Sequence, residues 1–235
     1  MNHFTGEFIG TMLLIIMGDG VVANVVLNKT KGNNGGWIVI TFGWGMAVFL
    51  GVYTSNALGG SGHLNPAVTI AMTAFNGFDP SLLLTYIAVQ FAGAITGAII
   101  VWLAYKQHFD STEDKNGMLA VFCNAPAIRS TTFNLITEII GTFVLVLGAL
   151  AMSKPASTLG ALDALPVGLL VLGIGLSLGG PTGYAINPAR DLGPRIAHFI
   201  LPIKNKRDSD WGYSWIPVIG PIIGALIAAY LFKLF

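Results

Sequence analysis

Charged residues are scarce in this sequence. Asp, Glu, Lys and Arg make up 10% of the 235 residues, whereas soluble domains carry roughly 25%. Hydrophobic residues make up 54%. So few charges cannot cover a water-facing surface, and this composition predicts an integral membrane protein.

Like-charged clusters and cysteine pairs are also missing. The formal net charge is +1 without a basic run or an acidic tail, so we expect no nucleic-acid partner. Cys123 is the single cysteine, which excludes an internal disulfide and a multi-cysteine metal site. We expect Cys123 to be a small residue in a loop, and we expect no metal and no cofactor. The start, MNHFTGEF, lacks the pattern of a signal peptide, so the first apolar stretch is predicted to be a retained span.

Long hydrophobic runs are abundant. A helix that crosses a hydrocarbon core of about 30 Å needs roughly 20 apolar residues. Two more apolar stretches reach only half that thickness, and polar stretches between the runs are predicted to be solvated loops. Full spans are predicted at 5–27, 37–56, 81–105, 133–153, 161–180 and 215–234, half-length segments at 66–76 and 188–200, and loops near 28–36, 106–131 and 200–214.

The two halves of the chain repeat. GEFIGTMLLIIMG at 6–18 matches TEIIGTFVLVLGA at 137–149, and each is followed by a full span, an Asn-Pro-Ala half-length segment and another full span. Three spans in each half make the second half enter the membrane from the opposite side. We therefore predict an all-α membrane protein with an inverted three-plus-three repeat. Its single channel domain is 1–235, with repeat one at about 1–108, repeat two at about 130–235, and a connecting loop at about 106–131.

The last span of each half carries paired glycines. Gly93 and Gly97 correspond to Gly220 and Gly224. This small-xxx-small spacing predicts that these spans approach a neighbouring helix closely.

The two Asn-Pro-Ala boxes predict helix starts. Proline is tolerated at the first helical position and asparagine is among the best N-caps, so helices should begin at Pro66 and Pro188 behind Asn65 and Asn187. About eleven helical residues span roughly 16 Å, which places each start near the bilayer midplane. The inverted repeat then directs both positive helix ends to one place.

Glycine-rich segments lead down to both boxes, at 57–64 and 179–186. Irregular backbone at membrane depth survives only where protein buries it or where it lines a water-filled cavity. Together with the two half-helices, these segments predict a pore.

Arg190 follows Asn187 by three residues, where the first repeat has Val68. An ion pair with Asp191 is the alternative role for this arginine. Adjacent helical residues diverge by about 100°, which favours a side chain that faces the pore instead. There its charge would repel cations, protons included, and its N–H groups would donate to neutral hydroxyls.

These features resemble a known family. The two Asn-Pro-Ala boxes, Arg190, the ExxGT starts at Glu7 and Glu138 and the three-plus-three repeat are similar to the major intrinsic proteins, the aquaporins and glycerol facilitators, over almost the whole chain. The resemblance implies that each of these two glutamates accepts hydrogen bonds from the backbone of a re-entrant loop. Their alternative role is that of proton relays.

The resemblance is closer to the glycerol facilitators, or aquaglyceroporins, than to water channels. Asp191 and Arg195 stand where that subgroup has an acid and a base, and Pro217 and Val218 replace the aromatic pair of water channels.

The resemblance also implies a selectivity filter at Trp44, Gly175, Tyr184 and Arg190. In FGWG, Phe42 is the alternative to Trp44. Gly175 stands where strict water channels place a histidine, and its lack of a side chain is expected to leave room for a carbon chain.

The resemblance places the centre of the pore at the two boxes. His63 is expected to be structural or to contribute only its backbone, with a pH gate as the alternative. The implied central constriction is Asn65, Pro66, Ala67, Asn187, Pro188 and Ala189, and the implied pore-lining carbonyls belong to Ser61, Gly62, His63, Gly183, Tyr184 and Ala185.

We therefore predict a passive channel, not an enzyme, for glycerol and other small uncharged solutes such as water, dihydroxyacetone, urea and protonated lactic acid, with ions and protons excluded. The alternative is a proton-coupled transporter that uses Glu7, Glu138 or Asp19. Asp19 has no counterpart in the second repeat, and a mouth-facing acid or a subunit contact are both open for it.

The family resemblance further implies a homotetramer in the lipid bilayer, in the plasma membrane, with both termini in the cytoplasm. That orientation leaves Lys154 and Lys233 as the clear positive charges inside, against the positive-inside rule. We give the family resemblance precedence, because it covers the whole repeat whereas the rule is statistical.

Overall fold

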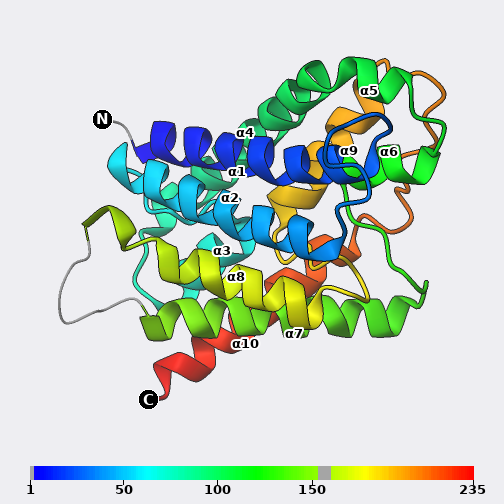
Figure 1. Cartoon of the computed structure of the whole chain (residues 1–235). Coiled ribbons are helices and arrows are strands. Elements are labelled where there is room, and N and C mark those ends of the chain that lie inside the picture. Colours follow the sequence, from blue (N-terminus) through cyan, green and yellow to red (C-terminus); the bar gives the residue numbers. More distant parts are fainter. Residues whose placement is uncertain (1–2, 153–159) are drawn as a thin grey trace.

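The computed structural model describes residues 3–152 and 160–235, and Figure 1 shows them as a bundle of helices. Five helices in the described part are long and apolar enough to cross a membrane. At about 1.5 Å per residue, even the shortest of them is roughly 27 Å long. They are α1 (His3–Val26), α2 (Trp37–Ala57), α4 (Leu83–Ala104, preceded by the 3-10 turn η1, Pro80–Leu82), α7 (Thr131–Met152) and α10 (Ile216–Lys233).

The predicted span at 161–180 is shorter than expected. Helix α8 (Leu165–Leu178) has 14 residues and follows a separate 3-10 turn, η2 (Gly160–Leu162). Pro166 lies in its first turn, and Gly179 caps its other end shortly before Pro181. Proline is favoured where a helix starts and cannot continue one that has ended, so both ends follow from local sequence. Lys154, which entered the orientation argument, lies outside the described residues.

The predicted loop at 106–131 is also corrected, because it contains two short helices, α5 (Lys106–Asp110) and α6 (Lys115–Phe122). Asp114 caps α6 by accepting a hydrogen bond from the backbone N–H of Asn116. The apolar end of α6, including Met118 and Phe122, is buried against α1 and α9 (Pro188–Ile200). Tertiary burial of an apolar face stabilises a helix too short to persist alone.

The two half-helices begin where the sequence predicts. Helix α3 (Pro66–Phe75) has Asn65 as its N-cap, whose side chain accepts from the N–H of Ala67 at 2.9 Å. Helix α9 has Asn187 as its N-cap, whose side chain accepts from the N–H of Ala189 at 3.0 Å. The predicted starts at the two prolines are confirmed.

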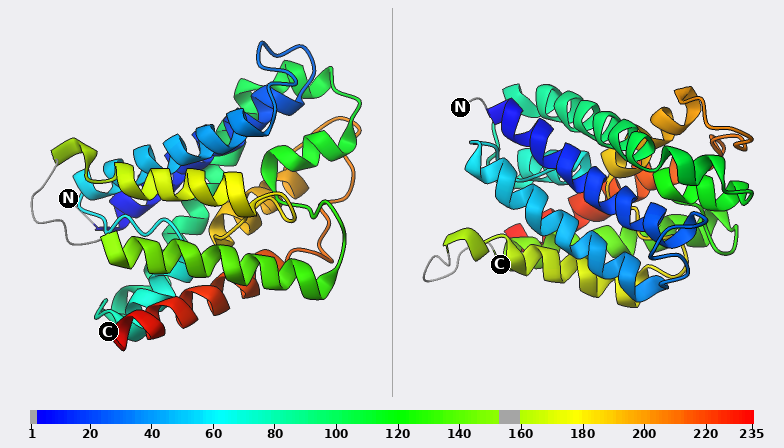
Figure 2. Two further views of the ribbon diagram at one scale, coloured as in Figure 1. Left: turned by 60° about the horizontal axis from the view of Figure 1, so that its bottom comes forward. Right: turned by 45° about the horizontal axis from the view of Figure 1, so that its top comes forward.

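The half-helices cross between the two halves of the chain. Helix α9 packs against α4, the last long helix of the first half, and α3 packs against α10, the last helix of the second half. Each half-helix therefore packs against a long helix from the other half of the chain. In the left view of Figure 2, α3 lies at the lower edge beside the red α10, in agreement with their contact.

The paired glycines lie where the long helices touch most closely. A Cβ atom at Gly93 would be 2.4 Å from the carbonyl oxygen of Phe8 on α1, and one at Gly224 would be 2.2 Å from that of Ile139 on α7. Helix α4 thus packs on α1 as α10 packs on α7, and the small-xxx-small prediction is confirmed at these contacts.

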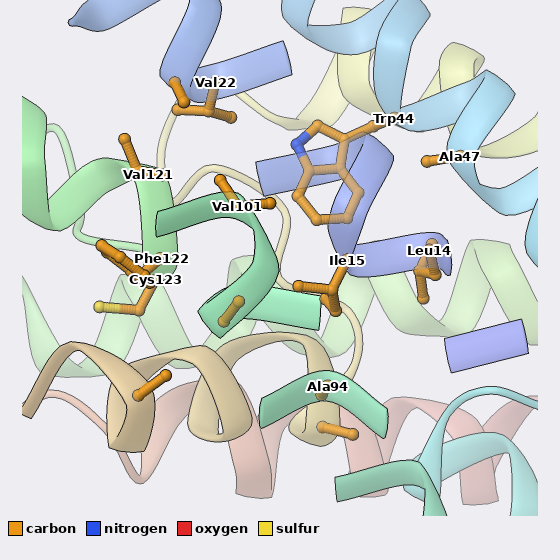
Figure 3. Close-up of a cluster of buried hydrophobic side chains, with 14 of the residues drawn as sticks. Leu14, Ile15, Val22, Trp44, Ala47, Ala94, Val101, Val121, Phe122 and Cys123 are labelled. Carbon is orange, nitrogen blue, oxygen red and sulfur yellow. The ribbon is translucent and has the colours of Figure 1, made fainter. Parts of the chain in front are cut away.

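Both described chain ends lie at the same end of the bundle, while α5 and α6 lie at the opposite end (Figures 1 and 2). The main hydrophobic cluster joins α1, α2, α4 and α6. Figure 3 shows part of it, with the Trp44 indole of α2 near Leu14 and Ile15 of α1. Cys123 belongs to this buried cluster, so the expected small loop residue is a core residue at the end of α6.

Candidate functional site

The two loops that precede the half-helices are joined by a reciprocal pair of hydrogen bonds. The Asn65 side-chain amide donates to the carbonyl of Ile186 at 2.8 Å, and the Asn187 amide donates to the carbonyl of Leu64 at 2.8 Å. Each asparagine is buried, and each amide nitrogen carries two N–H groups. One N–H of each amide joins the two loops, and the other makes no hydrogen bond within the part of the chain that the structure describes.

The acceptors of these bonds lie in unusual backbone. Leu64 has φ 52° and Ile186 has φ 45°, in the left-handed region that non-glycine residues rarely adopt. Such conformations persist only where the surrounding structure holds them. Here the reciprocal asparagine hydrogen bonds, together with hydrogen bonds to Glu7 and Glu138 described below, stabilise these conformations.

Glu7 of α1 supports the first loop. It is fully buried, and its carboxylate oxygens accept hydrogen bonds from α2, from the loop that precedes α3, and from α4. Gln90 of α4, one of its donors, also donates to the Thr69 hydroxyl of α3 at 3.0 Å, which ties the half-helix to the same network. The donors to Glu7 are the Ser55 hydroxyl, the backbone N–H groups of Ser61, His63 and Leu64, and the Gln90 amide, at 2.8–3.2 Å.

Glu138 of α7 supports the second loop in the same way. It accepts from the N–H groups of Ala185 at 3.0 Å and Ile186 at 2.8 Å, and it is 1% exposed. A buried carboxylate is tolerated when several N–H groups satisfy it. The geometry therefore matches the loop-supporting role that the family resemblance implies for both glutamates.

A cavity of about 120 Å³ runs along both loops. Its walls are mostly aliphatic, from α1, α2, α7 and α8, and its polar groups are few. The cavity is lined by these residues singled out from the sequence: Trp44, Gly62, His63, Asn65, Tyr184, Ala185, Asn187 and Arg190. It is not lined by Ser61, Gly175, Gly183, Asp191, Arg195, Pro217, Val218 or the Pro-Ala pairs of the two boxes.

The remaining wall residues are hydrophobic. No hydrogen bond among the described residues ends on the carbonyl oxygens of the six residues named for that role, from Ser61 to His63 and from Gly183 to Ala185. These oxygens are therefore available as acceptors.

Arg190 lies at one end of this cavity. Its guanidinium carbon is 3.8 Å from the centroid of the Trp44 ring, a close cation–π contact. Its Nη1 atom is buried without a hydrogen-bond partner. Trp44 is 4% exposed and lines the cavity, whereas the Phe42 side chain is 54% exposed and does not. The geometry thus favours Trp44 over Phe42 beside the arginine.

Asp191 does not pair with Arg190. It accepts from Arg195 at 2.8 Å and from the backbone N–H of Asn124 at 2.7 Å, all buried. Arg195 also donates to the carbonyls of Ser209 and Asn124 at 2.7 and 2.9 Å. This ion pair attaches α9 to the loops on either side, and it leaves Arg190 free to face the cavity.

Tyr184 occupies the space beside Gly175. A Cβ atom at Gly175 would be 2.8 Å from Cζ of Tyr184 and 2.9 Å from its hydroxyl. The Trp37 ring nitrogen donates to the Gly175 carbonyl at 3.0 Å, and its ring contacts Tyr184 edge-on at 5.8 Å between centroids. Gly175 therefore makes room for the tyrosine ring and does not itself open onto the cavity.

Sequence reasoning missed several members of the site. Trp37 and Gln90 carried no signal of their own, because neither belongs to a motif. Asp19 did carry a signal, since an acid inside an apolar span needs a reason. It is fully buried with one carboxylate oxygen 3.8 Å from Nη1 of Arg190, which excludes a contact between subunits for its side chain.

His63 is held by its surroundings. Its Nδ1 lies 3.2 Å from the Thr69 hydroxyl, and its ring packs on Phe78 and Tyr86. Within the described residues, no group of three or more His, Cys, Asp or Glu side chains is placed to hold a metal ion.

Comparisons with known proteins agree with this geometry. The family model described as "Major intrinsic protein" matches residues 1–232. The chain belongs to the major intrinsic protein family. With its five long apolar helices, this family member is an integral membrane protein with the aquaporin-like fold.

Individual relatives are similar over their full length. The "Probable glycerol uptake facilitator protein" of Thermotoga maritima is 57% identical over 233 residues, 99% of each chain. The "Glycerol uptake facilitator protein" of Streptococcus pneumoniae strain R6 is 55% identical over 235 residues, 100% of each chain. The X-ray structure of the aquaglyceroporin from Plasmodium falciparum has a TM-score of 0.86 at 33% identity, covering 98% of this chain and 94% of that one.

Proposed function

We propose that this major intrinsic protein is a passive channel for glycerol and other small uncharged solutes, among them water, dihydroxyacetone, urea and protonated lactic acid. The observation that carries the proposal is the lining of the cavity, which combines a few polar groups with many apolar side chains. Arg190 and the two box asparagines present donors, while Trp44 and aliphatic side chains form an apolar wall. A polyol has hydroxyls along one edge and carbon along the other, so it fits such a wall. The relatives' names support glycerol as the solute.

Selection along this path is divided between two places. Trp44, Tyr184 and Arg190 form the filter, and Gly175 contributes by leaving room for the tyrosine. Asn65 and Asn187 orient hydroxyls at the centre with their second N–H groups, and the free loop carbonyls accept hydrogen bonds from the solute hydroxyls. A fixed arginine and two positive helix ends repel cations, protons included.

A proton-coupled transporter has no support. Glu7 and Glu138 are occupied by hydrogen bonds from the loops. Asp19 does not line the cavity. The family and its relatives indicate transport without catalysis, so we propose no enzymatic activity.

The setting of the channel completes the proposal. We expect a homotetramer with one pore in each subunit, in the plasma membrane, with both termini in the cytoplasm. Exposed apolar side chains on α2, such as Ile38 and Phe42, suit contact with lipid or a second subunit. A reporter fused after Phe235 that proved to lie outside the cytoplasm would contradict the orientation.

Stopped-flow light scattering on proteoliposomes tests the transport mode. In a glycerol gradient the vesicles should shrink and then reswell much faster than protein-free vesicles. The reswelling rate should not change when a proton gradient is imposed. A rate that depends strictly on the proton gradient would contradict the channel.

A further inference from the structure

Two residues break the internal repeat by introducing a charge, and both lie beside the proposed filter. The match of Glu7 with Glu138 aligns Asp19 with Leu150. The match of the two Asn-Pro-Ala boxes aligns Arg190 with Val68. Asp191 and Arg195 also fall opposite uncharged residues, Thr69 and Thr73, but they pair with each other. Asp19 and Arg190 come from different halves of the chain.

These two exceptions meet in space. Oδ1 of Asp19 on α1 is 3.8 Å from Nη1 of Arg190 on α9, and the two side chains are 0% and 8% exposed. At the equivalent place in the other half, Leu150 and Val68 both belong to one apolar cluster with Ala67 and Val146. A charged pair in one half thus replaces an apolar contact in the other.

The two opposite charges lie close together but are not joined by a hydrogen bond. A separation of 3.8 Å is too long for an N–H···O bond, and both Asp19 oxygens and Nη1 of Arg190 lack a partner. Asp19 therefore offsets the arginine charge without using its N–H groups. A bonded carboxylate would occupy the donors that a solute needs, as Asp191 occupies those of Arg195.

The rest of the local charge is already balanced. Asp191 also acts electrostatically on Asp19, but Arg195 matches its charge at 2.8 Å. Gly18, the neighbour of Asp19, lets the Trp44 ring approach α1, because a Cβ at Gly18 would be 2.2 Å from that ring. The segment of Gly18 and Asp19 thus forms the back of the filter.

We propose that Asp19 is the counter-ion of Arg190 and a specificity-determining residue, which offsets part of the arginine charge without using the hydrogen-bond donors of the filter. This inference rests on the proposed function. Without Asp19 the uncompensated guanidinium attracts small anions into the pore. With it, neutral polyols pass and monovalent anions are refused.

The size of the effect follows from distance. An anion held by Arg190 lies roughly 7 Å from Asp19, and at an effective dielectric constant of about 20 the carboxylate opposes its entry by a factor on the order of 50. Water penetration and salt reduce this factor, so we expect an increase of about tenfold or more in anion entry when the charge is removed.

The test uses potassium nitrate with valinomycin, so that vesicle reswelling reports nitrate entry. Wild type should reswell in glycerol and admit nitrate no faster than protein-free vesicles. Asp19→Asn should raise nitrate entry about tenfold or more. Asp19→Glu, which keeps the charge, should restore exclusion, and Asp19→Asn/Arg190→Gln should lose the gain because the attracting charge is gone. Osmotic water flux from the same vesicles reports that each variant pore is intact.

The outcomes separate the two proposals. Wild-type vesicles that do not reswell in glycerol contradict the proposed function. Normal glycerol reswelling with Asp19→Asn at the wild-type nitrate rate, or with an equal gain in the double variant, contradicts the role of Asp19 alone.

A second measurement does not use Asp19→Asn. Arg190→Gln leaves Asp19 uncompensated, so it should admit potassium faster than wild type, as an encapsulated potassium-sensitive dye reports. Potassium entry equal to that of wild type would overturn the proposal.

Discussion

Gly175 gives the sharpest test of the filter, because its missing side chain is the space that Tyr184 fills. A Cβ atom there would lie 2.8 Å from Cζ of Tyr184 and 2.9 Å from a methyl carbon of Thr41, where ordinary contact begins at 3.4 Å. The ring must therefore move by about 0.6 Å to accept even alanine. Trp37 packs edge-on against this ring and Tyr184 lines the cavity, so we expect the ring to move toward the cavity.

We expect Gly175→Ala to lower glycerol permeability by about tenfold and water permeability by less than about threefold. Overpacking a close-packed site typically costs about 1–3 kcal/mol, and about 1.4 kcal/mol corresponds to a factor of ten in rate. The narrowed gap should lower the permeability of glycerol more than that of water, because glycerol is the larger solute. Both rates come from one stopped-flow trace, with water from the shrinking phase and glycerol from the reswelling phase.

Two variants control this prediction. Gly173→Ala lies on the same helix with no atom within 4 Å of its new Cβ, so it should change neither rate. Gly175→Ala/Tyr184→Leu removes the clashing ring atoms and should recover most of the glycerol flux. Equal losses of water and glycerol in Gly175→Ala, or no loss of either, would refute the reasoning and place the selective step elsewhere.

Two further predictions concern the supports of the site. Glu7→Gln should lower the free energy of unfolding by about 2–4 kcal/mol, because its amide group would turn a donor toward the loop N–H groups. Thermal unfolding of the purified protein, followed by tryptophan fluorescence, measures this loss. An unchanged melting temperature would contradict the loop-supporting role of Glu7. Arg195→Met should destabilise by about 3–5 kcal/mol, because it leaves Asp191 charged, buried and unpaired. Adding Asp191→Leu should restore part of that loss in the same assay, and a double variant less stable than Arg195→Met would argue against the pairing.

The helix starts at the two boxes were predictable because local chemistry determines them. Asn65 and Asn187 cap in the extended conformation that an N-cap requires, and the following prolines need no N–H bond. The close contacts at Gly93 and Gly224 were predictable for the same reason, since spacing alone indicates which face lacks side chains.

Other features depend on tertiary contacts that a single sequence does not display. The stretch around α6 reads as a polar loop because its acids and lysine surround a short apolar run, yet α1 and α9 bury that run. The space at Gly175 could be predicted, but not that Tyr184 would fill it, because the two residues lie on separate elements. Asp19 was visible as an anomaly, and only the structure shows that Arg190 is beside it.

The reciprocal asparagine bonds also bear on how the chain is made. Asn65 and Ile186 are 121 residues apart, and Leu64 and Asn187 are 123 apart. While the ribosome is still adding the second half, the first re-entrant loop has its glutamate but not its crossing partners. Contacts of such separation form late. The centre of the channel is therefore completed only after residue 187 has entered the bilayer, so a chain that ends between the halves holds a half-helix whose Asn65 amide has no partner from the second loop.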